Sequence, residues 1–218
     1  MSDYKYSDTD LDAVYRVISE RRDIRHFLPD PVDEAVLVKL LKAAHQAPSV
    51  GLMEPWRFIR ITQQDQRDAI HACVQREALK TAEALGERKE AFLRLKVEGV
   101  LSCGELIVLA LPPDREKHVF GRRTLPEMDL ASAACAVQNF WLAARAEGLG
   151  LGWVSIFEPK ELSNILQMPE GSLPIAILCL GHVKEFYPEP LLVTEKWTTS
   201  EALEKLVFYN RWENTEDV

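Results

Sequence analysis

The most constraining feature of the sequence is the segment 129–147, DLASAACAVQNFWLAARAE, which is rich in alanine and apolar around nearly its whole helical circumference. A helix that is apolar on every side has to be covered on every side, so this pattern favours the interior of a fold over its surface. Gly148 follows directly, and glycine is the residue that most often ends a helix. We therefore expect a buried central helix over 129–147.

Apolar runs predict the strands that surround this helix. The runs 106–111, 151–155 and 175–180 are almost continuously apolar, which is typical of short strands buried on both faces. A further strand is expected at 56–61. The whole chain is therefore expected to form one α+β or α/β domain, residues 1–218, with a mixed central sheet.

Helical spacing of apolar residues predicts three more helices. The first is expected to start behind Thr9 as its cap and to run to Arg21. The second is expected to be capped by Asp33 and stopped by Pro48. A short helix is expected at 159–166.

Two segments depart from this pattern. Residues 65–96 carry dense charge and few apolar side chains, which predicts a mostly exposed helical excursion, or a lid, rather than core. The residues from about 190 to 218 are expected to form an extended carboxyl arm, in which Thr198 and Glu201 have the spacing of a capping box.

The overall charge excludes several classes of partner. Asp and Glu number 34 against 26 Lys and Arg, giving a net charge of −8. A surface this acidic repels nucleic acids and anionic lipids, so neither is expected as a partner, and a phosphate ligand needs a local basic pocket. No segment has the pattern of a signal peptide or approaches the roughly 20 apolar residues of a membrane span, so we expect a cytoplasmic protein.

The cysteines and histidines lack the spacing of a metal site, and no metal is predicted. The four cysteines are far apart and three have apolar surroundings, which indicates reduced core thiols in the cytosol: Cys73, Cys103, Cys135 and Cys179. The glycines of 148–152 fit neither a dinucleotide-binding nor a P-loop pattern, and are interpreted as a turn between the central helix and a strand.

Positive charge is concentrated at 21–25, RRDIR, where three arginines occur within five residues of an acidic chain. Arginine forks match phosphate oxygens, although the dipole of the preceding helix also favours arginines at its carboxyl end. A second notable stretch, 47–56, contains a serine, a glycine and two prolines between a helix and a strand. Such a stiff loop is suited to holding the edge of a flat ligand.

With these segments the sequence resembles the nitroreductase family of FMN-binding proteins, whose members carry RRxxRxF and APSxxNxQPWxF motifs. The resemblance covers most of the chain, and its segments are specific jointly rather than singly. They are RRDIRHF at 21–27, HQAPSVGLMEPWRF at 45–58, MDLASAACAVQNFW at 128–141, GLGLGWVSIF at 148–157 and LCLG at 178–181.

The resemblance implies a nitroreductase-like α+β fold, FMN as the ligand and a symmetric homodimer with a flavin site at each interface. It also implies that FMN is bound by Arg21, Arg22, Asp23, Ile24, Arg25, Pro48, Ser49, Met53, Trp153 and Ser155.

Two positions point to one oxygen-dependent branch of this family, and both are expected to be catalytic. Asp23 stands where ordinary members usually have serine, and a carboxylate near a phosphate repels the ligand unless it has a role. The alternative is that Asp23 only pairs with Arg22 or Arg25. Ser155 places a hydroxyl among apolar and aromatic neighbours; the alternative is that it bonds only to local backbone.

The loop 47–56 departs from the family pattern at Leu52 and Glu54, where members commonly have Asn and Gln. An ionised glutamate cannot donate to a flavin carbonyl as glutamine can. Glu54 is therefore expected to be protonated, turned away or bonded to an arginine.

The resemblance implies that the protein cleaves reduced FMN with O2, forming the dimethylbenzimidazole lower ligand of cobalamin and erythrose 4-phosphate, and that a separate reductase supplies the reduced flavin. Two alternatives remain: an NAD(P)H-dependent FMN nitroreductase, and a flavin-binding protein without catalytic activity.

Overall fold

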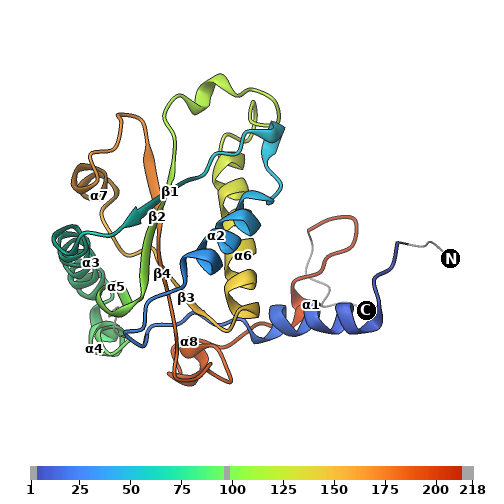
Figure 1. The fold of residues 1–218 in the computed structure, drawn as a ribbon, viewed down its shortest axis with the longest axis horizontal. Helices are drawn as coiled ribbons and strands as arrows, with labels where there is room; N and C mark the ends of the chain where they lie inside the picture. Colours follow the sequence, from blue (N-terminus) through green and yellow to red (C-terminus); the bar gives the residue numbers. More distant parts are fainter. Residues whose placement is uncertain (1–3, 96–98, 213–218) are drawn as a thin grey trace.

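In the computed structural model, which describes residues 4–95 and 99–212, the chain folds into three layers with a sheet in the middle (Figure 1). The strand order is β1-β2-β4-β3, and all three strand pairs are antiparallel. The strands are β1 (Arg57–Ile61), β2 (Glu105–Leu111), β3 (Gly150–Val154) and β4 (Leu173–Gly181). The α+β class is confirmed, but the parallel pairing expected of a mixed sheet is reduced, in the part described, to an isolated bridge between Asp23 and Leu151.

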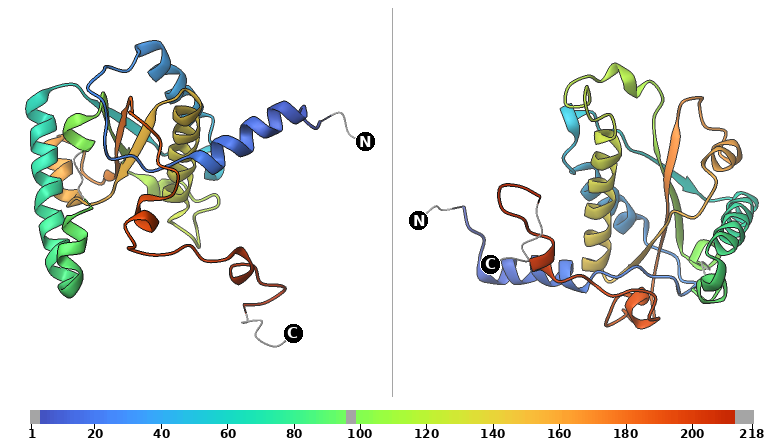
Figure 2. Two further views of the ribbon diagram at one scale, coloured as in Figure 1. Left: turned by 90° about the horizontal axis from the view of Figure 1, so that it is seen from below. Right: turned by 180° about the vertical axis from the view of Figure 1, so that it is seen from behind.

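Helices cover both faces of the sheet, with α2 and α6 on one side and α3, α5 and α7 on the other (Figures 1 and 2). None of the helices described is long and apolar enough to cross a membrane. The helices are α1 (Asp8–Glu20), α2 (Glu34–His45), α3 (Gln64–Ala84), α4 (Lys89–Leu93), α5 (Gly99–Ser102), α6 (Met128–Ala146), α7 (Pro159–Ile165) and α8 (Leu191–Thr194). Short 3₁₀ turns occur at Val50–Leu52, Gly86–Arg88, Arg115–Lys117 and Leu203–Lys205.

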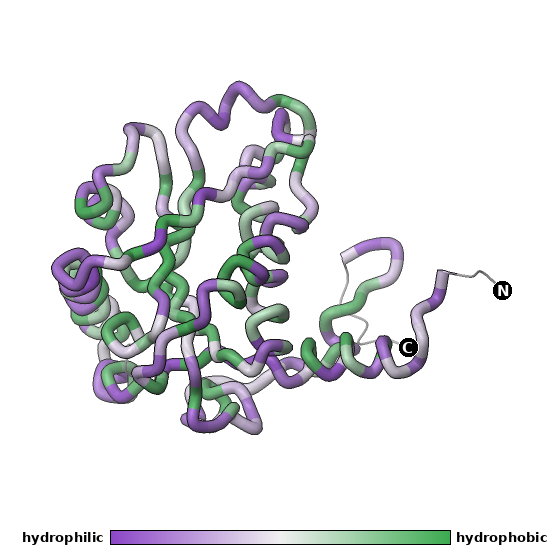
Figure 3. The backbone as a smooth tube through the Cα atoms, viewed as in Figure 1, coloured by the Kyte–Doolittle hydropathy of each residue, from purple (hydrophilic) through white to green (hydrophobic). Residues whose placement is uncertain are grey.

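The core follows from the continuously apolar strands, because alternate side chains of one strand enter different layers. Ile107 and Leu109 of β2 pack with α2 and α6, whereas Leu106 and Val108 pack on the side of α3, α5 and α7. In Figure 3, hydrophobic residues accordingly lie along the central strands. Three cysteines lie in this core as predicted, and Cys135 is exposed on α6.

The predicted central helix forms as α6, but one chain covers only part of its surface. Phe140 and Ala136 are fully buried against the sheet and α2. Leu130 and Cys135 on another side of the helix are exposed. The expectation of burial all round is therefore met on one side only, because nothing else in the described chain covers the other side.

The segment 65–96 was expected to be a mostly exposed helical excursion rather than core; α3 is helical as expected, but it also contributes to the core. Its inner face supplies five buried residues to the layer over the sheet: Ile70, Cys73, Val74, Ala78 and Ala82. Small and apolar residues at helical spacing are enough for this contact, although charged residues outnumber them. Lys96, at the end of the expected lid, lies outside the described residues, as do positions 213–218 of the arm, and movement as a lid stays a prediction.

Two of the predicted caps are also corrected. Asp33 caps α2 as predicted, its Oδ1 accepting from the N–H of Ala35 at 2.8 Å. Helix α1 is capped by Ser7 instead of Thr9, because the helix starts one residue before Thr9. Thr198 starts no helix; its hydroxyl faces the carbonyl of Thr199 at 3.4 Å.

Candidate functional site around Asp23

The segment that follows α1 lies along the free edge of β3 and fixes the position of Asp23. The N–H of Ile24 donates to the carbonyl of Leu151 at 3.0 Å, and the N–H of Trp153 donates to Asp23 Oδ1 at 2.9 Å. This close approach requires glycine at 152, because a Cβ there would collide with the carbonyl oxygen of Ile24. The carboxylate is thereby held near the carboxyl end of β3.

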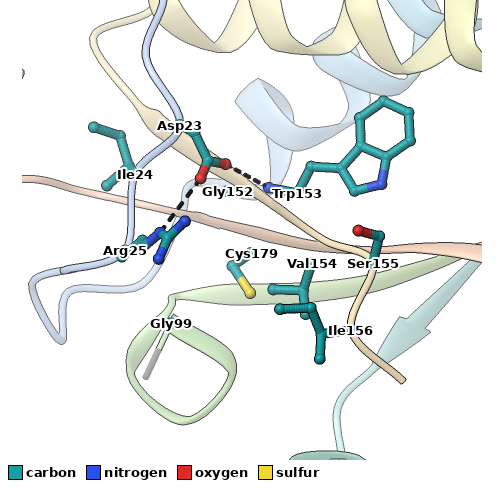
Figure 4. Close-up of a pocket in the computed structure, with 10 residues that line it drawn as sticks. All are labelled: Asp23, Ile24, Arg25, Gly99, Gly152, Trp153, Val154, Ser155, Ile156 and Cys179. Carbon is teal, nitrogen blue, oxygen red and sulfur yellow. Dashed lines mark hydrogen bonds and ion pairs between the residues drawn. The ribbon is translucent and has the colours of Figure 1, made fainter. Parts of the chain in front are cut away.

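Asp23 borders a pocket that two distant segments and the strands β3 and β4 enclose (Figure 4). It also lines two neighbouring hollows, one between the end of α1 and the carboxyl arm and one beside α6. The carboxylate is therefore placed where three recesses meet. The residues of the first pocket are Asp23, Ile24, Arg25, Gly99, Gly152, Trp153, Val154, Ser155, Ile156 and Cys179.

The electrostatics of Asp23 are a balance between burial and cationic neighbours. Burial raises the pKa of this carboxyl above its ordinary value, against the opposing effects of the Trp153 N–H and of Arg25 and Arg21. Asp23 Oδ2 lies 3.5 Å from Arg25 Nε, and the side chain keeps 37% of its exposure. A partly exposed carboxyl with a raised pKa is suited to exchanging a proton with a ligand.

The three predicted arginines surround Asp23 but have different partners. Arg22 donates to the carbonyls of Ser19 at 2.7 Å and Pro188 at 2.8 Å, so it ties the end of α1 to the carboxyl arm. Arg25 pairs with Asp23 and donates to a backbone carbonyl of the turn after α4. The guanidinium carbon of Arg21 lies 4.6 Å from the ring centroid of Trp141 on α6. The pairing considered for Asp23 is thus formed with Arg25.

Ser155 follows the last residue of β3 and lines the same pocket as Asp23. Its hydroxyl has no hydrogen-bond partner within the described residues, so the alternative of a bond to local backbone is not observed there. The side chain is exposed, which corrects the expectation that neighbouring residues shield it. Trp153 separates the two predicted catalytic residues, and its ring packs against Trp141 with 6.4 Å between centroids.

The predicted ligand loop at 47–53 lies at the other half of α6. The N–H of Val50 donates to Ser132 Oγ at 3.0 Å, whereas Trp141 Nε1 donates to the carbonyl of Arg22 at 3.1 Å. Ser132 and Trp141 are nine residues apart on α6, or about 13 Å along its axis. One chain therefore does not bring three predicted loop residues into the Asp23 pocket: Pro48, Ser49 and Met53.

Glu54 has a partner that the sequence did not indicate. Its Oε1 lies 3.8 Å from His45 Nε2, and its own N–H donates to Ser49 Oγ at 3.1 Å. Arg57 reaches only the backbone carbonyl of Glu54, at 3.1 Å. Of the three alternatives expected for Glu54, a bond to an arginine is therefore not observed among the described residues, and the carboxylate contacts His45 instead.

Sequence reasoning missed several residues that line the pocket. Gly152 was interpreted as part of a turn, although only Gly148 ends the helix, with φ of 75°. The sequence signal that could have found Gly152 is the occurrence of glycine at every second position of 148–152. In a strand, this spacing places Gly150 and Gly152 on the same face of β3. Cys179 was predicted as a core thiol; it is buried and also borders the pocket.

Comparison with known proteins identifies relatives along most of the chain. A curated protein of Rhodospirillum rubrum named 5,6-dimethylbenzimidazole synthase is 39% identical over 86% of this chain and 88% of its own. One of Rhodobacter capsulatus with the same name is 40% identical over 88% of this chain and 94% of its own. The solved structure of an iodotyrosine deiodinase bound to FMN and 3-iodo-L-tyrosine superposes with a TM-score of 0.71 at 20% identity, covering 91% of this chain and 100% of that one.

A model of the nitroreductase family matches residues 18–182, which include the Asp23 segment, all four strands and α6. The match spans more than half of the chain, and the relatives at 39% and 40% identity cover 86% and 88% of it. The chain therefore belongs to the nitroreductase family.

Proposed function

We propose that this protein is a 5,6-dimethylbenzimidazole synthase, which converts reduced FMN and O2 into 5,6-dimethylbenzimidazole and erythrose 4-phosphate for the lower ligand of cobalamin. The observation that carries this is the identity of 39–40% to two proteins of that name over most of both chains. The carboxylate of Asp23 at the meeting point of three recesses supports it.

The residues around Asp23 fit reduced FMN. Arginines gather there in an otherwise acidic chain, which suits a phosphate, and the nearby rings of Trp141 and Trp153 offer apolar surface. Arg21 and Arg25 are proposed to hold the phosphate end, with Ile24 and Trp153 beside the flavin. Arg22 is proposed to act mainly by holding the arginine segment, since backbone carbonyls already bind it.

Asp23 is proposed as the catalytic carboxylate. When bound, reduced FMN supplies the carbon atoms of the benzimidazole, and O2 accepts its electrons. Asp23 Oδ1 accepts from the Trp153 N–H at 2.9 Å, whereas Oδ2 faces Arg25, with 3.5 Å between Oδ2 and Nε. Oδ2 is proposed as the atom that takes a proton from the ribityl chain and returns it, and burial raises the carboxyl pKa in the direction this requires.

Ser155 is proposed to orient the reacting part of the flavin with its hydroxyl. It lines two of the recesses that Asp23 lines, and the described residues occupy neither its donor nor its acceptor. A free hydroxyl at that place can bond to a ligand without first breaking a bond within the protein.

A second copy of the chain is proposed to complete the site. Residues 47–53 and Asp23 lie at different halves of α6, and none of residues 47–53 lines the three recesses at Asp23, so this loop is proposed to reach the flavin from the partner. The apolar face of α1 also stays uncovered in one chain, with Tyr15 68% and Val14 51% exposed. A homodimer that buries α1 and the exposed side of α6 meets both requirements.

The test is to incubate the protein with chemically reduced FMN and O2 and to analyse the mixture by mass spectrometry. The expected result is 5,6-dimethylbenzimidazole, with loss of FMN. A nitroreductase would retain its FMN and oxidise NADH in the presence of a nitroaromatic, and a flavin carrier would do neither. A separate cytoplasmic reductase is proposed to supply reduced FMN in the cell, so adding one with NADH should replace the chemical reductant.

A further inference from the structure

Cys179 is a pocket residue to which the proposed function gives no role. Its thiol is buried and borders the same pocket as Asp23, and in Figure 4 its sulfur is seen between Gly99 and Val154. A Cβ added at Gly99 would lie 3.5 Å from this sulfur, so α5 packs directly against it. An oxidisable sulfur is therefore present in the wall of the site, near the proposed catalytic carboxylate.

A second buried thiol, Cys103, lies next to Cys179. Cys103 is in the short connection between α5 and β2, and Cys179 on β4 pairs in register with Leu106 of β2. The Cys179 S–H donates a hydrogen bond to the Cys103 sulfur. Both side chains pack on the side of the sheet covered by α3, α5 and α7, away from the proposed dimer face on α6. Two sulfurs already in contact can be joined in a disulfide with a small local shift.

Arg67 of α3 adds a positive charge to this pair. Its Nη1 lies 3.7 Å from the Cys103 sulfur and donates to the Cys103 carbonyl at 2.7 Å. The Cys179 S–H and the Arg67 charge lower the pKa of the Cys103 thiol, although burial opposes them. The bond to Cys103 and burial raise the pKa of Cys179. The negative charge of a thiolate is therefore favoured on Cys103, with Cys179 as its hydrogen-bond donor.

We propose that Cys103 and Cys179 form a redox site, in which hydrogen peroxide entering through the Asp23 pocket converts the two thiols into a disulfide. The Cys179 sulfur attacks one peroxide oxygen and the O–O bond breaks. Its proton passes to the Cys103 thiolate and then to the departing hydroxide, which leaves as water. The Cys103 thiolate next attacks the Cys179 sulfur and displaces the second oxygen, which leaves as water after taking a proton from solvent. The two sulfurs together lose two electrons, which reduce peroxide to water.

The position of the pair agrees with this oxidant. Two-electron reduction of O2 by a reduced flavin gives hydrogen peroxide, so on the function proposed above the oxidant would form at the pocket that Cys179 borders. The disulfide itself does not depend on that function, because peroxide from any source can form it.

The test follows the loss of thiols and needs no turnover. The full-length protein with Cys135→Ser, which removes the exposed thiol, is treated with hydrogen peroxide, unfolded and labelled with N-ethylmaleimide. Of its four original cysteines three remain, and two of these should escape labelling, with dithiothreitol restoring both. Mass spectrometry of proteolytic fragments should join positions 103 and 179. Cys73→Ala in the same background is the matched control and should form the same disulfide, since the Cys73 sulfur faces the Glu158 carbonyl at 3.9 Å and does not line the pocket.

Two further variants test the roles within the pair. Cys103→Ala removes both the base and the resolving thiolate, so Cys179 should stay fully labelled. Arg67→Met should slow disulfide formation by about tenfold or more, the loss of one interaction with a charged group. Arg67→Lys keeps the charge and should restore most of the rate, whereas a variant that only loosened the fold would speed the labelling of every buried thiol.

Saturating oxidised FMN should slow the reaction, because it fills the pocket through which peroxide enters. The proposal would be overturned by a pair that stays reduced at peroxide concentrations that oxidise Cys135 of the wild type, by a link formed through Cys73, or by an unchanged rate with FMN bound. Failure to bind FMN in a fluorescence titration would count only against the proposed function, since peroxide alone still tests the pair.

Discussion

Burial of Asp23 makes its contribution to the stability of the fold depend on pH. Burial raises its pKa above the value of about 3.8 for an exposed aspartate, so the folded state binds this proton more tightly than the unfolded state. The contribution of protonated Asp23 to the free energy of unfolding is therefore fully present below pH 3.8. It is lost as the pH rises through the pKa that Asp23 has in the folded state. At neutral pH the charge of Asp23 destabilises the fold.

Asp23→Asn should consequently raise the unfolding temperature at pH 7 while abolishing synthesis of 5,6-dimethylbenzimidazole. The amide oxygen can still accept from the Trp153 N–H, but the proton acceptor Oδ2 is gone. Thermal unfolding at pH 7 and at about pH 4 checks the stability part, because the gain should shrink at the lower pH. A variant with full synthase activity would exclude a catalytic role for Asp23.

Ser155→Ala should lower turnover by about tenfold, the loss of a single hydrogen bond, with little change in flavin affinity. The exposed hydroxyl has no partner in the described part of the chain, so the unfolding temperature should stay unchanged. Single-turnover rates and thermal unfolding of the same variant decide the matter. A drop in stability with an unchanged rate would assign Ser155 a purely structural role.

At the scale of elements, the site depends on how closely the 21–25 segment approaches β3. Gly152→Ala should break this contact, because the new Cβ would collide with the Ile24 carbonyl oxygen. The expected cost is roughly 1–3 kcal/mol of stability, together with loss of flavin binding as Asp23 and Arg25 move away.

Gly86→Ala is the control for that variant. Unlike Gly152, Gly86 has a positive φ, of 54°, but an added Cβ there meets nothing within 4 Å. Its unfolding temperature should fall modestly and flavin titration should remain normal. Normal flavin binding by Gly152→Ala would show that the glycine is not needed for the site.

The elements that could be predicted are those whose formation is indicated by a pattern within a short stretch of sequence. Strand β2 and helix α6 were recognised because continuous apolar runs and an alanine-rich helix occur within short windows of sequence. The pairing of Asp23 with Leu151 joins positions far apart in the chain and leaves no local signal. The same holds for Asp129, which is buried between Arg115 and Arg122 at 2.9 Å from each.

At the scale of the molecule, one chain leaves a large apolar surface exposed. Helix α1 has no buried residue and projects from the body, as does the arm with Leu203 and Trp212 exposed (Figures 1 and 2). Hydrophobic residues recur along both segments in Figure 3. Surfaces of this kind are typical of interfaces between protein chains.

The protein should therefore sediment at micromolar concentration as a species of twice 24.8 kDa, with an interface well over the roughly 2,000 Å² of obligate pairs. Val14→Glu together with Tyr15→Lys should shift the protein toward monomers. Flavin affinity should fall as well, because a monomer lacks the 47–53 loop that a second chain would supply. Wild-type protein that sediments only as a monomer would contradict the dimer.

The contact of the 21–25 segment with β3 has a consequence for solubility as well. β3 is an outer strand of the sheet, and such strands can recruit strands of other molecules through their unpaired N–H and carbonyl groups. Ile24 and Asp23 occupy two of these groups, the Leu151 carbonyl and the Trp153 N–H. The residues that build the site thus also shield an edge that would otherwise favour aggregation, and selection against aggregates would conserve this segment independently of catalysis.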